Sequence, residues 1–208
     1  MYPIMDSVSQ ENWFDSIRRE LETAYLAADT PWGQSGFAGP YARWEACRRP
    51  IADCIISDGT FLDIGCANGY LLECLLRWTA ERGISLRPWG LDISENLAAL
   101  ARKRLPQFEN QIITGNSFYW KPPRQFDYVR TELCYVPQES HQEYISRLMD
   151  EFLLPTGRLL VAEYRSSKDP PDVPWVDKAL ERMDFAIENC TSGSWEGGEL
   201  TRVAVIAK

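Results

Sequence analysis

The chain has 208 residues, a length that suits one domain with a full hydrophobic core and leaves little room for a second independent domain. Its formal net charge at pH 7 is −8, from 22 Lys and Arg against 30 Asp and Glu. This balance argues against a nucleic-acid partner, because such binding draws much of its affinity from Lys and Arg, and it favours a small-molecule or protein substrate.

Two helices joined by a glycine-rich loop are predicted at the N-terminus. Apolar residues recur at three- and four-residue intervals over residues 9–28, which indicates an amphipathic helix that docks on a core. A second helix is predicted over residues 41–56, with Pro50 leaving its middle uncertain or kinked. Residues 30–40 contain three glycines and two prolines, which is typical of a loop. We expect residues 1–57 to form an N-terminal helical cap.

A strand, a tight turn and a helix are predicted over residues 60–72. Gly65 and Gly69 lack side chains where the backbone must turn sharply and let a ligand approach, and the helix that begins near Tyr70 offers unpaired N–H groups. This geometry suits a nucleotide-like cofactor. Asp63 would repel a phosphate and attract a cationic amino group, so the turn favours a ligand that carries an ammonium group.

The sequence from Asp63 to Gly69, Asp-Ile-Gly-Cys-Ala-Asn-Gly, resembles the first motif of the class I S-adenosylmethionine-dependent methyltransferases, an acidic residue followed by a glycine-rich turn. Ala67 departs from the glycine that is usual in the family. A left-handed backbone would cost alanine roughly 1–2 kcal/mol, so we expect Ala67 to keep a negative φ while Gly65 and Gly69 take the special angles. Cys66 is interpreted as a small residue beside the cofactor rather than as a nucleophile.

Asp92 ends a second predicted strand, Leu86–Leu91, and Ser94 is placed to cap the helix that follows. In a βαβ unit of this kind, an acidic residue at the end of the second strand accepts hydrogen bonds from both ribose hydroxyls. The resemblance also includes Ile93 among the residues that contact the cofactor.

Three residues that follow a third short strand, residues 111–114, are interpreted through the resemblance. Methyltransferases of this family commonly place a polar residue against the adenine edge there and an apolar residue against its face. Asn116 and Phe118 are the candidates for these two contacts, and Ser117 between them is included in the cofactor site.

A fourth strand, Phe126–Arg130, leads into a loop that should face the reactive centre. In that loop Glu132 and Tyr135 are the candidates to orient the methyl acceptor, the alternative being that they tie the loop to the N-terminal cap. Trp32 and Phe37 are expected to close the pocket as a lid, since the glycines around them permit movement. The alternative is a cap that only packs on the core.

The remaining polar residues give no sign of a metal site or a membrane span. The six cysteines form no Cys-x-x-Cys pair and His141 is the only histidine, so we expect reduced thiols and no metal. The N-terminus lacks a basic region followed by an apolar run, and no stretch of about 18 apolar residues occurs, so we expect a soluble cytoplasmic protein with no membrane partner. The pair Arg48–Arg49 could hold an acidic substrate, although a solvated helix face is the simpler interpretation. The oligomeric state is left open.

The rest of the chain completes an α/β fold. A helix over residues 139–154, a fifth strand over residues 158–164 and a terminal hairpin over residues 185–207 are predicted. The resemblance covers residues 58–208 as one methyltransferase domain. It implies a Rossmann-like seven-stranded methyltransferase sheet, mostly parallel with an antiparallel C-terminal strand.

The resemblance implies methyl transfer from S-adenosylmethionine to a small organic acceptor, by an in-line displacement that positioning and desolvation accelerate. One alternative is a nucleotide-dependent oxidoreductase. The turn argues against it, because it lacks the G-x-G-x-x-G pattern of dinucleotide sites. The other is a non-catalytic cofactor-binding module, which the sequence leaves open.

Overall fold

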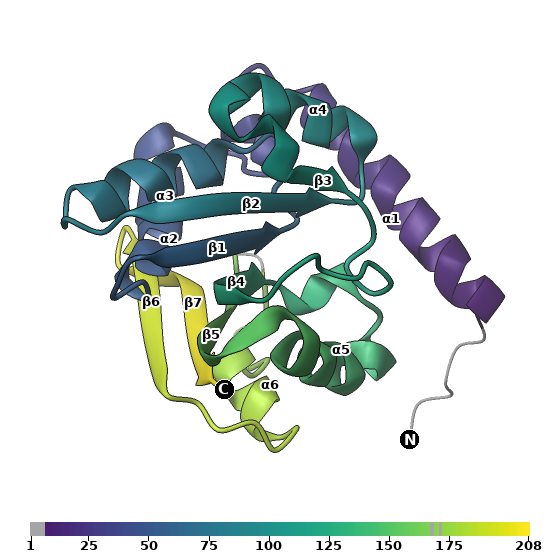
Figure 1. The fold of residues 1–208 in the computed structure, drawn as a ribbon, viewed down its shortest axis with the longest axis vertical. Helices are drawn as coiled ribbons and strands as arrows, with labels where there is room; N and C mark the ends of the chain where they lie inside the picture. The colour runs from purple at the N-terminus through teal and green to yellow at the C-terminus, as the bar shows by residue number, and fades with distance from the viewer. Residues whose placement is uncertain (1–6, 167–168, 171) are drawn as a thin grey trace.

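The fold is organised around one seven-stranded sheet, and the computed structural model describes residues 7–166, 169–170 and 172–208. The strands lie in the order β3-β2-β1-β4-β5-β7-β6 (Figure 1). Their bounds are β1 Gly59–Ile64, β2 Leu86–Asp92, β3 Ile112–Thr114, β4 Phe126–Thr131, β5 Leu153–Tyr164, β6 Asn189–Trp195 and β7 Gly198–Ala207. β7 is antiparallel to both of its neighbours, and the other neighbouring pairs are parallel. This arrangement confirms the predicted sheet with its antiparallel C-terminal strand.

The described residues also form six α-helices. Their bounds are α1 Ser7–Leu26, α2 Tyr41–Asp53, α3 Tyr70–Ala80, α4 Glu95–Arg104, α5 His141–Arg147 and α6 Val176–Glu181. The helix predicted over residues 139–154 is shorter than expected, because α5 passes into a π-helical turn at Leu148–Phe152. The chain then enters β5 earlier than the apolar pattern indicated.

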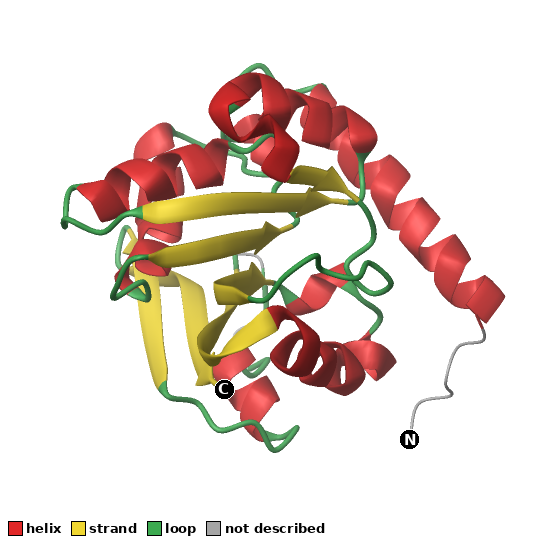
Figure 2. Ribbon diagram, in the orientation of Figure 1, coloured by secondary structure: helices red, strands yellow, loops and turns green. Residues whose placement is uncertain are grey.

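Helices cover both faces of the sheet, and each face has its own apolar cluster (Figure 2). One cluster contains Trp44 of α2 and Trp78 of α3. The other contains Phe14 of α1, Tyr144 of α5 and Leu180 of α6. All six residues of β1 are buried, as expected for a central parallel strand that is covered on both faces.

α2 belongs to the core rather than to a cap. It packs against β6, β7 and α3, and Trp44 in its first turn is fully buried. Gly193 of β6 permits the close approach, because a Cβ there would lie 2.4 Å from the Ala46 carbonyl oxygen. The expectation that both N-terminal helices form a cap therefore does not hold for α2. The packing of α2 into the core leaves α1 and the loop after α1 as the segment that can cover a site.

The cysteines are all free thiols, four of them buried and two, Cys134 and Cys190, exposed. The described part of the chain contains no group of three or more His, Cys, Asp or Glu side chains placed to hold a metal ion. Among the helices in the same residues, none is both long and apolar enough to span a membrane.

Candidate functional site

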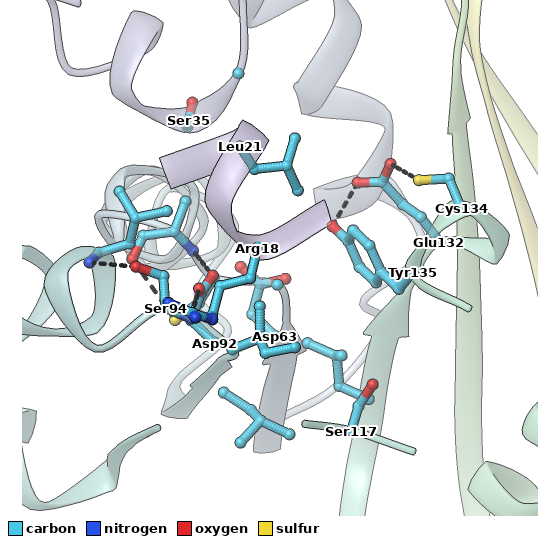
Figure 3. A pocket seen from close by; sticks show the side chains of 18 of the residues that line it. Arg18, Leu21, Ser35, Asp63, Asp92, Ser94, Ser117, Glu132, Cys134 and Tyr135 are labelled. Atoms are coloured by element: carbon cyan, nitrogen blue, oxygen red, sulfur yellow. Dashed lines mark hydrogen bonds between the residues drawn. The ribbon is translucent and has the colours of Figure 1, made fainter. Parts of the chain in front are cut away.

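A cavity of about 420 Å³ lies at the carboxyl ends of β1, β2 and β4, beneath α1 (Figure 3). Most of its lining comes from the ends of these strands and the turns that follow them, from the loop after β3 and from one face of α1, with further residues from α2, from β5 and from the loop after α1. Parallel strands bring their carboxyl ends to one edge of the sheet, which is where open α/β sheets bind ligands. A volume of this size is in the range that holds a small organic ligand.

The turn after β1 contains three residues with positive φ: Gly65 at +73°, Ala67 at +47° and Gly69 at +74°. The expectation of a negative φ for Ala67 is wrong. The Ala67 N–H donates to Asp92 Oδ2 at 2.8 Å, and this bond between the turn and the end of β2 holds the alanine in the left-handed region. Gly65 also permits a close approach, because a Cβ there would lie 2.5 Å from Cζ of the Tyr135 ring.

Ala67→Gly is expected to stabilise the protein by up to about 1 kcal/mol. A left-handed alanine costs roughly 1–2 kcal/mol, and the greater freedom of glycine in the unfolded chain offsets part of the gain. Urea unfolding followed by circular dichroism measures the change. Ala99→Gly, in the middle of α4, is the control and should destabilise by about 1 kcal/mol. A lower unfolding midpoint for Ala67→Gly would show that the turn is not strained.

Asp92 is held by two backbone N–H groups at the end of β2. Its Oδ1 accepts from the Ser94 N–H and its Oδ2 from the Ala67 N–H, both at 2.8 Å. A carboxylate offers about four acceptor positions, so about two remain for a ligand. Burial raises the pKa of Asp92 to about 6, although both backbone hydrogen bonds act to lower it. Ser94 also accepts from the Leu97 N–H at 3.2 Å, which confirms the predicted helix cap.

Asp63 is fully buried in β1, directly opposite Arg130 of β4 in the register of the two strands. Its Oδ1 accepts from Arg130 Nη1 at 3.2 Å, whereas its Oδ2 has no hydrogen-bond partner among the described residues. Burial raises the pKa of Asp63 to about 6, and the Arg130 guanidinium opposes that rise. Because an unpaired buried acceptor is costly, this oxygen indicates a place for a cationic ligand group.

Arg130 joins the two sides of the cavity, and the sequence analysis assigned it no role. Its Nη1 also donates to Tyr135 Oη at 3.0 Å. Its Nη2 donates to Glu132 Oε1 and, at 3.0 Å, to Tyr164 Oη. One feature of the sequence could have identified Arg130. It stands at the end of a predicted strand that should be covered on both faces, and a buried cation must be paired with another group.

Glu132 and Tyr135 lie together on the loop after β4 (Figure 3). Tyr135 Oη donates to Glu132 Oε1 at 2.7 Å, and Cys134 Sγ donates to Glu132 Oε2 at 3.4 Å. Burial raises the pKa of the Tyr135 phenol. Cys134 is exposed as a residue, but desolvation of its thiol at the cavity and the neighbouring Glu132 charge raise the pKa of the thiol. Both groups are therefore neutral donors near neutral pH, and the carboxylate accepts from each.

Arg48 is buried in the cavity wall, so the interpretation of a solvated helix face is wrong for this residue. It is 8% exposed, and its Cζ lies 3.4 Å from the centroid of the Tyr164 ring. Its Nη1 is buried without a hydrogen-bond partner in the described residues. Arg49 does face solvent, where it pairs with Glu81 at 3.0 Å. The unpaired N–H group of Arg48 indicates a place for an anionic ligand group.

α1 covers the cavity with one face of the helix, and Figure 3 shows Leu21 on the side of the cavity opposite Asp63. Glu22 on the same helix accepts from Ser94 Oγ at 2.7 Å and from Asn96 Nδ2 at 2.6 Å. These two bonds anchor α1 to the start of α4. The lining residues of α1 are Phe14, Ile17, Arg18, Leu21 and Tyr25.

Trp32 and Phe37, the predicted lid, do not line this cavity. The Trp32 ring packs at 5.6 Å from the Tyr41 ring, and the Phe37 ring lies 5.5 Å from the Arg43 guanidinium. Both aromatic residues line a second hollow of about 440 Å³ between the end of α1 and the loop. The cover over the first cavity is thus provided by α1 and by the part of the loop at Ser35 and Gly36.

Asn116 and Ser117 line the cavity, whereas Phe118 does not. The Phe118 ring packs at 6.0 Å from the Phe14 ring and at 6.5 Å from the Tyr144 ring, within the core cluster. Its predicted contact with an adenine face therefore lacks support. The other predicted cofactor residues divide in the same way: Gly65, Cys66, Ala67 and Ile93 line the cavity, and Gly69 stands outside the lining at the start of α3.

Comparison with known proteins connects this site to one family. A family model described as a methyltransferase domain matches residues 61–157, which span β1, β2, β3, β4 and the start of β5. The matched segment contains the glycine turn, Asp92, Asn116 and the Glu132–Tyr135 loop. No curated protein matches the sequence.

Several solved methyltransferase structures share the fold. 1,6-Didemethyltoxoflavin-N1-methyltransferase from Burkholderia thailandensis aligns with a TM-score of 0.69 and 14% identity, over 100% of this chain and 92% of that chain. Magnesium protoporphyrin IX methyltransferase from Synechocystis PCC 6803 aligns with a TM-score of 0.57 and 16% identity, over 100% of both chains. A SAM-dependent methyltransferase from Aquifex aeolicus aligns with a TM-score of 0.58 and 16% identity, over 80% of this chain and 94% of that chain. At these identities the similarity shows the fold.

Proposed function

Since residues 61–157 belong to a methyltransferase family and the chain has the class I methyltransferase fold, we propose that it transfers a methyl group from S-adenosylmethionine to a small organic acceptor. The observation that carries the proposal is a single cavity that joins the glycine turn after β1, the Asp92 carboxylate and the Glu132–Tyr135 pair. Groups suited to a cofactor and groups suited to an acceptor thus share one enclosed space.

The unpaired atoms of the cavity support the cofactor assignment. Asp63 Oδ2 and Arg48 Nη1 carry opposite charges, and both lack hydrogen-bond partners among the described residues. The amino-acid part of S-adenosylmethionine carries an ammonium and a carboxylate, which complement these two groups. Asp92 keeps acceptor positions for the ribose diol. Asn116 lines the same cavity and is the proposed partner of the adenine edge.

The Glu132–Tyr135 pair is proposed to orient the acceptor and remove its proton. Tyr135 Oη donates to Glu132 and accepts from Arg130, which leaves one oxygen lone pair for an O–H, N–H or S–H of the acceptor. Bound S-adenosylmethionine supplies a methyl group on a positively charged sulfur. When the acceptor takes that methyl group, its proton would move to Tyr135 Oη and the Tyr135 proton to Glu132 Oε1.

α1 is proposed to exclude water from the reacting atoms. Its apolar residues Phe14, Ile17 and Leu21 line the cavity, and a dry cavity strengthens the electrostatic contacts within it. In this proposal α1 and the loop after it supply the cover, and residues 58–208 together with Arg48 of α2 supply the cofactor site.

Calorimetric titration is expected to show that S-adenosylmethionine and S-adenosylhomocysteine bind with Kd values of about 1–100 µM, a range typical of enzyme substrates. NAD should bind at least about a hundredfold more weakly, because the turn lacks the dinucleotide pattern. Tight NAD binding without binding of S-adenosylmethionine would reverse the assignment. A screen of small organic acceptors with methyl-labelled cofactor then tests turnover. Cofactor binding without transfer to any acceptor would favour a non-catalytic module.

A further inference from the structure

Arg130 is the charged centre of the cavity floor. It is 2% exposed and lies at the penultimate position of β4, where the strand pairs with β1. Its guanidinium contacts the Asp63 carboxylate, the Glu132 carboxylate and the hydroxyls of Tyr135 and Tyr164. Its Nη1 also donates to the Ile64 carbonyl oxygen at 3.2 Å. A side chain with this many fixed acceptors is held in one orientation.

The position of Arg130 matters because Asp63 has almost no other compensation for its burial. Asp63 is fully buried, and among the described residues its carboxylate accepts one hydrogen bond, from Arg130 Nη1. The charged and titratable groups that act on it are Arg130 and Arg48, which favour its anion, and Glu132, which opposes it. The Asp63 charge in turn raises the pKa of the Asp92 carboxyl, the Cys66 thiol and the Tyr135 phenol, and none of these groups is cationic.

The neutral and the anionic form of Asp63 are therefore close in free energy near neutral pH. Burial favours the neutral acid, and Arg130 is the strongest of the influences that oppose burial. A protonated carboxyl cannot attract a cationic group by charge, and its O–H would point a donor at a ligand ammonium. The cofactor contact that we assign to Asp63 Oδ2 thus depends on a residue that need not touch the cofactor.

We propose that Arg130 is a positioning residue that keeps Asp63 in its anionic form at neutral pH and fixes Oδ2 toward the ammonium group of the cofactor. This proposal rests on the proposed function, since it takes S-adenosylmethionine as the ligand. In this role Arg130 need not contact the cofactor or the methyl acceptor. By bonding Glu132 and Tyr135 with the same guanidinium, it also ties the cofactor side of the cavity to the acceptor side.

The test is the pH dependence of S-adenosylmethionine affinity for the full chain, from about pH 5.5 to about pH 9 at constant ionic strength. For the parent, affinity should fall as the pH drops through about 6, where the pKa values of Asp63 and Asp92 lie, and again above about pH 8, where the α-amino group of the ligand loses its proton. For Arg130→Met the Asp63 part of this fall should move upward by about two pH units. Affinity near pH 7 then drops about tenfold, while near pH 9 it stays within about threefold of the parent.

Two further variants separate this role from simple packing. Arg130→Lys keeps the positive charge and should keep a profile close to that of the parent. In an Asp63→Asn background, Arg130→Met should leave the shape of the profile unchanged, because the titrating group is gone. A loss of affinity by the same factor at every pH would assign Arg130 a packing role and overturn the proposal.

A second measurement covers the case in which Arg130→Met does not fold. Carbon-13 NMR titration of the Asp63 carboxyl in the ligand-free parent should show an anion at pH 7. A protonated Asp63 in the parent at that pH would overturn the proposal whatever the variants do. Failure of the parent to bind S-adenosylmethionine at any pH would instead contradict the proposed function, and the NMR titration of Asp63 in the parent and in Arg130→Lys would still test the electrostatic role.

Discussion

Asp92→Ala is expected to weaken S-adenosylmethionine binding at least about tenfold, and by about a hundredfold if both ribose hydroxyls are bound. Hydrogen bonds to a charged acceptor contribute about 1.5–3 kcal/mol each, and about 1.4 kcal/mol corresponds to a factor of ten in affinity. The two free acceptor positions of Asp92 are the structural reason, since its other two are taken by the Ser94 and Ala67 N–H groups. Calorimetric titration measures the change.

The loss of the Ala67 hydrogen bond could loosen the turn, so the Asp92 experiment needs two controls. Asp127→Ala removes another carboxylate that holds a backbone N–H, that of Thr60 at 2.7 Å, at the opposite end of the sheet. It should leave cofactor affinity unchanged. The second control is a cofactor analogue without both the 2′- and the 3′-hydroxyl of the ribose, which should bind weakly to the parent but lose no further affinity in Asp92→Ala. If Asp92→Ala remains folded and binds the cofactor like the parent, Asp92 has a structural role only.

Tyr135→Phe is expected to lower kcat by about a hundredfold, since a positioned proton acceptor typically contributes about 10²–10⁴ in rate. The change removes the hydroxyl that donates to Glu132 at 2.7 Å and accepts from Arg130 at 3.0 Å, while the ring that covers Gly65 remains. Glu132→Gln keeps the size of the side chain and removes its charge, and it should lower kcat by a similar factor. Rates are measured with an acceptor identified in the labelled-cofactor screen.

The control for the Tyr135 experiment is Tyr128→Phe, which removes a tyrosine hydroxyl from β4 at the far end of the sheet. That hydroxyl accepts from the Ser57 N–H at 3.1 Å and does not line the cavity. Tyr128→Phe should keep full turnover when the protein is folded. Cofactor affinity should stay within about threefold of the parent in Tyr135→Phe. Unchanged rates in both Tyr135→Phe and Glu132→Gln would contradict the proposed proton transfer and leave positioning of the acceptor as the mechanism.

Local signals along the chain were enough to predict most of the fold. The strand, turn and helix around residues 60–72, the helix cap at Ser94 and the terminal hairpin of β6 and β7 all follow from patterns that involve residues near one another in sequence. The position of Asp92 at a strand end follows in the same way, because a parallel sheet brings successive strand ends to one edge. These features depend on periodicity, on glycine and on capping, which are properties of short segments.

Contacts between distant segments account for what the patterns missed. Ala67 takes a positive φ because it donates to Asp92, 25 positions away, and Arg130 is buried against Asp63, 67 positions away. Arg48 is covered because α2 packs into the core, where sequence alone suggested a solvated face. A strained backbone or a buried cation is unfavourable in isolation, and only the partner that the folded chain brings to it makes it stable.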